Sequence, residues 1–230
     1  MGCSGYCDFY RNFSEKKKEE DGIEIKDVKQ NTKTDDSIEN ILKKNYDMDD
    51  NQTKFNENAL EENNTYRQYH NSPKLNLDVK LSEMAFNYAK NYSKNKDMGK
   101  YLRKNNINVI EEESDKKLSA KELFKKWYEE KNINNGFDFN NLDDKNNLVY
   151  KHFTQMIWKK SEKFGIGYLD DEEKKKYIYV ALYSPKGNLC NRYSQNINID
   201  NEEKNEKNTP DFINPEKRLT NKNEENETSN

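Results

Sequence analysis

The sequence predicts an α+β fold, a three-layer α-β-α sandwich, with a disordered tail at each end of the chain. Three observations support this prediction: apolar residues at helical spacing before residue 130, strands rich in aromatic and β-branched residues after residue 160, and ends with almost no apolar content. Helices and antiparallel strands mixed in this way pack as layers on a shared sheet.

Composition divides the chain into three parts. Hydrophobic residues make up 31% of the 230 residues and charged residues 36%, which cannot supply a core along the whole length. We expect a flexible leader over residues 1–51, a folded domain over residues 52–200, and a polar tail over residues 201–230. The leader can form one short helix over residues 36–46, where a cap-like start precedes apolar positions.

Two helices are predicted in the first half of the domain. Apolar residues recur at helical spacing over residues 77–92. Ser119 and Glu122 fit a capping box, in which the Ser hydroxyl accepts from a free amide and the Glu reaches back. The buried stripe of this second helix consists of Leu123, Phe124, Trp127 and Tyr128.

Two antiparallel strands are predicted in the second half. Residues 164–168 form a strand that contains two glycines, and residues 170–176 are polar enough to form a hairpin connection. The strand at residues 177–183 is apolar on both faces, which is typical of a strand inside a sheet covered on both sides.

Charge, hydropathy and cysteine content exclude several classes of protein. A net charge of -3 gives no basic excess to neutralise phosphates, so no nucleic-acid partner is expected. No apolar run approaches the roughly 18 residues of a spanning helix, and no secretory signal is apparent. Cys3, Cys7 and Cys190 are an odd set rather than a disulfide framework, so we expect Cys190 to be reduced.

The first seven residues suggest a lipid anchor. Gly2 is positioned for N-myristoylation, and Cys3 and Cys7 are candidates for palmitoylation. One myristoyl chain binds a membrane with a constant of only about 10⁴ M⁻¹, so stable anchoring needs a second acyl chain. These residues predict a protein on the cytosolic face of the plasma membrane or an internal membrane, not a secreted one.

Four landmarks, in order, resemble the CAP superfamily of cysteine-rich secretory, antigen 5 and pathogenesis-related proteins. They are residues 64–75, Trp127–Glu130, residues 151–168 with His152 near a helix start, and residues 179–188. Where secreted relatives usually carry a disulfide cysteine, this chain has Ala181. The chain therefore looks most like the intracellular branch, the Golgi-associated plant pathogenesis-related proteins, some of which are N-myristoylated.

The resemblance implies a cavity holding two histidines and two glutamates. His152 matches the second histidine, and Glu130 matches the glutamate of the Trp-Tyr-x-Glu segment. The other glutamate corresponds to Glu111, with Glu112 as the alternative.

The first histidine of that cavity has no counterpart in this chain. Counting without gaps from His70, which belongs to a helix-end motif outside the cavity, places Lys100 at its position. A protonated lysine has no lone pair for a metal, so no zinc is expected. Lys100 is expected instead to pair with Glu111 or Glu130.

These residues leave three functions to compare. The first is a membrane-anchored, non-enzymatic CAP module that binds a lipid, a sterol, a fatty acid or a protein partner, including a second copy of itself. The alternative is a hydrolase that uses His152 with Glu130 or Glu111. Ser161 could be paired with His152 as its nucleophile, but the sequence shows no recognisable oxyanion hole or nucleophile elbow. A secreted, metal-binding CAP protein is the third reading, opposed by the missing histidine.

Overall fold

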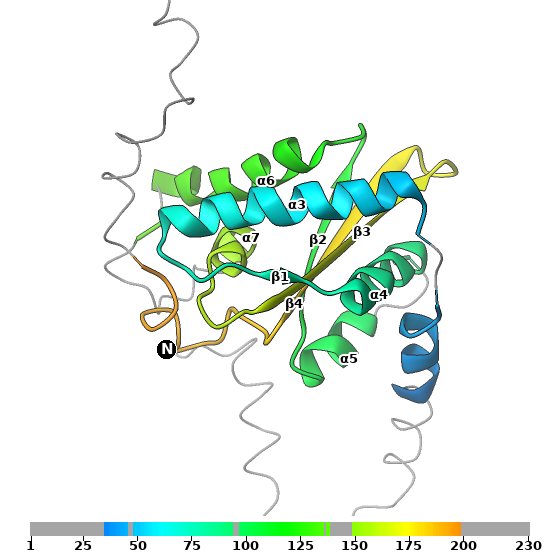
Figure 1. The fold of residues 1–230 in the computed structure, drawn as a ribbon, viewed down its shortest axis with the longest axis horizontal. Coiled ribbons are helices and arrows are strands. Elements are labelled where there is room, and N and C mark those ends of the chain that lie inside the picture. Colours follow the sequence, from blue (N-terminus) through cyan, green and yellow to red (C-terminus); the bar gives the residue numbers. More distant parts are fainter. Residues whose placement is uncertain (1–34, 46–47, 94–96, 136, 139–148, 199–230) are drawn as a thin grey trace, which may run out of the picture.

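A four-stranded mixed sheet lies at the centre of the computed structural model, which describes residues 35–45, 48–93, 97–135, 137–138 and 149–198 (Figure 1). The strand order is β1-β3-β4-β2, with β1 parallel to β3 and the other pairs antiparallel. The strands are β1 (Asn76–Leu77), β2 (Asn108–Ser114), β3 (Lys163–Asp171) and β4 (Lys176–Ser184). The helices are α3 (Asp50–Tyr69), α4 (Val79–Lys90), α5 (Met98–Lys104), α6 (Ala120–Tyr128), the 3-10 helix η1 (Glu129–Asn135) and α7 (Lys151–Met156).

Helices cover both faces of the sheet, which confirms the predicted three-layer α+β sandwich. Helices α3, α6 and α7 lie on one face, and α4 and α5 lie on the other (Figure 1). Because side chains alternate along a strand, β4 contributes to two separate cores. Tyr179, Ala181 and Tyr183 belong to the α6/α7 side, whereas Ile178, Val180 and Leu182 belong to the α4 side.

Helix α4 packs its backbone directly against β3. A Cβ atom at Gly165 would lie 2.3 Å from the Ser82 amide nitrogen, and one at Gly167 would lie 2.4 Å from the Phe86 amide nitrogen. Both glycines point to the same face because they are two residues apart in a strand. They thus form a flat strip on which α4 rests.

A helix at residues 35–42 extends the packed unit beyond the predicted domain. Its Ile38 and Leu42 side chains are fully buried against α4 and α5. Asn87 of α4 donates from Nδ2 to the carbonyl oxygens of Leu42 (3.2 Å) and Lys44 (2.7 Å). The sequence placed this helix in a flexible leader, because its polar composition does not reveal that two of its apolar side chains enter the core.

Other local predictions have mixed outcomes. The capping box of Ser119 and Glu122 is present at the start of α6. Helix α5 and strand β2 were not predicted. The tails expected to be disordered, over residues 1–34 and 199–230, lie outside the described residues, and none of the described helices is long and apolar enough to cross a membrane.

Candidate functional site

Glu130 and His152 meet at the start of α7. The amides of His152 and Phe153 donate to Glu130 Oε2 over 2.9 and 3.1 Å, and His152 Nδ1 lies against Glu130 Oε1. Tyr150, the residue that precedes α7, provides no side-chain cap. Glu130 from η1 therefore caps α7 from another element, satisfying two amides that would otherwise have no partner.

The second ring nitrogen of His152 is also engaged. His152 Nε2 lies 3.1 Å from the backbone carbonyl oxygen of Glu111, which can only accept. A carbonyl oxygen only accepts, so Nε2 donates to it, while Nδ1 shares a hydrogen bond with the Glu130 carboxyl group. Trp127 stacks on the imidazole with ring centroids 5.2 Å apart and planes inclined by 8°. His152 is only 6% exposed, so this pair forms a closed network.

The glutamates of β2 divide between the two faces of the sheet. The Glu111 carboxylate accepts from the Tyr88 hydroxyl on the α4 side. Burial, and then the charge of Glu111, raise the pKa of Tyr88. Glu112 points to the α6 side, where it accepts from Trp127 Nε1 (3.2 Å) and Lys126 Nζ (2.7 Å). Adjacent strand residues face opposite ways, so only the Glu112 carboxylate lies on the α6 side. The choice between Glu111 and Glu112 as the cavity residue stays a prediction.

The structure places Lys100 away from this network. It lies on α5, exposed, on the face of the sheet opposite to His152 and Glu130. Lys100 therefore lies on the other face from Glu130, because a count along the chain does not measure position in space. Its expected pairing with Glu111, whose carboxylate lies on the α4 side, stays a prediction. His70 forms the C-terminal cap of α3, where its Nε2 lies 3.0 Å from the Tyr128 hydroxyl.

Ser161 is buried and fully engaged away from His152. Its hydroxyl donates to the Pro185 carbonyl (2.9 Å) and accepts from Gln155 Nε2 (3.0 Å). The same Gln155 accepts from the Gly187 amide over 3.0 Å. Ser161 therefore joins the loops that follow α7 and β4, a structural role that its place in the motif does not reveal.

The residues of this site do not fit a metal ion. Within the part of the chain that the structure describes, no three His, Cys, Asp or Glu side chains are arranged to hold one. Nε2 of His152 donates to the Glu111 carbonyl oxygen, so this nitrogen offers no lone pair to a metal in this arrangement.

Arg67 is the residue with the largest structural role that sequence reasoning missed. It is fully buried in α3 and donates only to backbone carbonyls: Nε to Pro73 (2.6 Å), Nη1 to Met156 and Trp158 (2.9 Å each), and Nη2 to Ser161 (3.1 Å). Burial lowers its pKa to about 10. Arg67 thereby fixes the loop after α7; an arginine inside a motif next to a predicted turn was the only signal for this role.

Cys190 is disulfide-bonded, which corrects the expectation of a reduced thiol. It is the sole cysteine among the residues that the structure describes, and it is exposed. The proposed acylation residues Gly2, Cys3 and Cys7 lie outside those residues, so lipidation stays a prediction.

An α-β-α sandwich with a buried Glu–His pair at the start of α7 defines a CAP-type domain. Residues 60–183, more than half of the chain, match the Cysteine-rich secretory protein family (CAP), and the chain belongs to that family.

Named relatives support this membership. The chain is 32% identical over 142 residues to Secreted protein RBT4 of Candida albicans, covering 60% of this chain and 36% of that protein. It is 28% identical over 152 residues to human Golgi-associated plant pathogenesis-related protein 1, covering 62% and 92%. Among solved structures, NaASP2 with Zn2+ has a TM-score of 0.50 at 17% identity over 63% of this chain and 87% of that one. BmVAL-1 also has a TM-score of 0.50, at 20% identity over 62% and 81%.

These relatives overturn one prediction. RBT4 and a second Candida albicans relative, PRY1 (30% identical over 144 residues), are both named secreted proteins, which contradicts the predicted cytosolic, non-secreted location. The aligned part spans about a third of the length of each.

We expect Glu130→Gln to destabilise the fold by about 2 to 3 kcal/mol, because one amide oxygen cannot replace a carboxyl group that serves two backbone amides and an imidazole nitrogen. Urea unfolding followed by circular dichroism measures this change. Glu129→Gln is the matched control: Glu129 has a 56% exposed side chain and a 3.7 Å ion pair with Lys125, against 15% exposure for Glu130. The free energy of unfolding of Glu129→Gln should fall by less than about 0.5 kcal/mol. An equal fall in both variants would contradict the capping role of Glu130.

Proposed function

We propose that this CAP domain is a non-enzymatic binding module. The main support is that both ring nitrogens of the candidate catalytic histidine, His152, are engaged within the protein: Nδ1 with the Glu130 carboxyl group and Nε2 with the Glu111 carbonyl oxygen. A general base needs a nitrogen that faces the proton it removes. Ser161, the candidate nucleophile, instead bonds Pro185 and Gln155.

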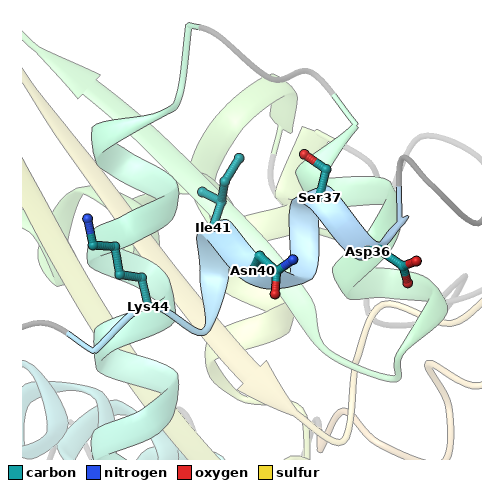
Figure 2. Close-up of a pocket in the computed structure, with 5 residues that line it drawn as sticks. All are labelled: Asp36, Ser37, Asn40, Ile41 and Lys44. Carbon is teal, nitrogen blue, oxygen red and sulfur yellow. The ribbon is translucent and has the colours of Figure 1, made fainter.

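The ligand site in this proposal is a surface groove beside the helix at residues 35–42. One open depression of about 550 Å³ is lined by Asp36, Ser37, Asn40, Ile41 and Lys44 (Figure 2). A second, of about 420 Å³, shares Ile41 and Lys44 and continues over Asn87 and Lys90 of α4 and over Asn91, the C-cap of α4. We call these two depressions together the Ile41 groove.

The lining of the Ile41 groove fits an anionic amphiphile. Ile41 supplies apolar surface, and the exposed Lys44, which follows the helix at residues 35–42, and Lys90, at the end of α4, supply positive charge. Asn87 holds the two walls together through its bonds to the carbonyls of Leu42 and Lys44. A fatty acid, with a carboxylate and an apolar chain, matches this combination better than a sterol, which has no charge to pair with lysine.

Charge reversal in the groove tests the ligand class. In Lys44→Glu/Lys90→Glu, the Kd for a fluorescent fatty acid should rise about tenfold, since each exposed pair contributes about 0.7 kcal/mol. The control is Lys54→Glu/Lys160→Glu, which makes the same charge change at exposed positions outside the groove. Equal weakening in both variants, or a sterol that binds as well as the fatty acid, contradicts the assignment.

An assay for hydrolysis tests the absence of catalysis. The purified chain should not cleave peptide or ester substrates above the buffer rate. Turnover that is present in the wild type and lost in His152→Gln would overturn the non-enzymatic proposal and favour the hydrolase reading.

A further inference from the structure

The Ile41 groove lies between two walls that belong to different segments of the chain. One wall is the helix at residues 35–42, followed by Lys44, and the other is the C-terminal end of α4 with Lys90. Figure 1 shows this helix, in blue, at the periphery of the molecule, where it packs on α4 and α5. A ligand that contacts both walls therefore requires the helix to be docked.

Buried side chains and hydrogen bonds hold the helix at residues 35–42 to the domain. Ile38 and Leu42 are 1% and 0% exposed and belong to the core that α4 and α5 also line. Asn87 of α4 donates to the carbonyl oxygens of Leu42 (3.2 Å) and Lys44 (2.7 Å) at the C-terminal end of the helix. The other side chains of the helix are at least partly exposed, so its attachment depends mainly on these contacts.

This helix is too short to persist once it leaves the domain. Isolated helices of fewer than about 12 residues are marginal in water, so undocking melts the segment. The ion pair of Asp35 with Lys104 of α5 (2.6 Å) joins side chains that are 32% and 70% exposed, and it contributes little. The four strands of the described sheet all lie within residues 76–184 and pair without this segment, which also precedes the family match at residues 60–183.

We propose that residues 35–45 form a latch that opens separately from the rest of the domain, and that an anionic amphiphile in the Ile41 groove holds it closed. The role of the ligand rests on the proposed function of the groove, whereas the opening itself does not. A ligand that binds only the closed latch lowers the open population by the factor 1 + [L]/Kd. Loss of the ligand lets the latch open more often and uncovers the apolar side chains of α4 and α5 that share its core.

Amide hydrogen exchange of the full chain, followed by NMR, measures the opening. The Lys43 amide reports on the latch because it donates to the Glu39 carbonyl oxygen over 2.9 Å. It should exchange at least about tenfold faster than the hydrogen-bonded amides of β4, since local opening costs less free energy than global unfolding. Equal exchange at Lys43 and in β4 would show that the latch opens only when the whole domain unfolds, and would overturn the proposal.

Asn87→Ala tests what holds the latch closed. The variant loses both hydrogen bonds to the latch while alanine suits α4, so exchange at Lys43 should become about tenfold faster and the β4 amides should be much less affected. The control is Asn58→Ala, the same substitution at an exposed position of α3, which should change neither rate. Leu42→Ala lies in the latch itself and should also speed exchange at Lys43. Exchange at Lys43 that is as slow in Asn87→Ala and Leu42→Ala as in the wild type contradicts a separate latch.

Lauric acid tests control of the latch by a ligand. Its Kd is taken from displacement of the fluorescent fatty acid, and at ten times that concentration exchange at Lys43 should slow about elevenfold. Lauric acid that binds, and binds more weakly to Lys44→Glu/Lys90→Glu, but leaves exchange at Lys43 unchanged overturns the latch and leaves the proposed function standing. Lauric acid that does not bind at all overturns the proposed function, and ligand control of the latch with it.

Discussion

Replacing Arg67 by methionine is expected to lower the free energy of unfolding by about 4 kcal/mol or more. The guanidinium is fully buried and serves four backbone carbonyls, those of Pro73, Met156, Trp158 and Ser161. Methionine fills a similar volume but leaves these acceptors without donors, and each unsatisfied buried acceptor costs about 1 to 3 kcal/mol. Urea unfolding of the purified variant, or loss of soluble expression, measures the effect.

The control for this prediction is Arg192→Met. Arg192 is exposed, and its side chain makes one 3.3 Å bond, to Gln195, so the loss should stay below about 0.5 kcal/mol. Arg67→Lys should lower the free energy of unfolding almost as much as Arg67→Met does. The single ammonium nitrogen of lysine cannot reach all of the carbonyl oxygens that the three guanidinium nitrogens of Arg67 contact. A stable Arg67→Lys variant would show that charge, rather than the shape of the guanidinium, is what this position requires.

Replacing Gly167 by alanine is the second change expected to have a large effect, with a loss of about 3 kcal/mol. The new Cβ would lie 2.4 Å from the Phe86 amide nitrogen and 2.6 Å from Phe86 Cα, both backbone atoms of α4. A helix backbone cannot move aside as a side chain can, so α4 would have to shift off the sheet. Thermal unfolding measures the change, which we expect to appear as a lower Tm.

Gly99→Ala is the matched control for Gly167→Ala. The added Cβ would meet only side-chain atoms, the Tyr88 hydroxyl at 2.9 Å and Arg103 Nη2 at 3.0 Å, and Gly99 lies in a helix, where alanine is favoured by about 1 kcal/mol. Its stability should therefore change by less than about 1 kcal/mol. If both variants lose the same stability, backbone contact between α4 and β3 is not what requires glycine at position 167.

Much of the fold could be predicted from local patterns. The residues at 177–183 are apolar on both faces, and β4 indeed contributes to two cores. The capping box at Ser119 could be predicted because it involves only residues three positions apart. Strand β2 was not predicted, because Glu111, Glu112 and Glu113 conceal its apolar start at Val109 and Ile110.

The candidate site could be predicted only in part. The motif residues Glu130 and His152 are brought together as the resemblance implied. The choice between Glu111 and Glu112 depended on strand register, where a shift of one residue changes the face of the sheet. The position of Lys100 depended on the path of α5 across the other face, which a count along the chain does not contain.

The sequence by itself determined the family, the helix and strand types, and the pairing of Glu130 with His152, because these depend on short-range patterns and ordered motifs. Only the tertiary structure decided which glutamate carboxylate of β2 lies on the α6 side, that Arg67 holds the loop after α7, and that the helix at residues 35–42 belongs to the core. It also placed Cys190 in a disulfide, where the sequence had suggested a reduced thiol. The reason is physical: burial and contact between residues far apart in the chain arise only once the layers pack, and no local pattern records them.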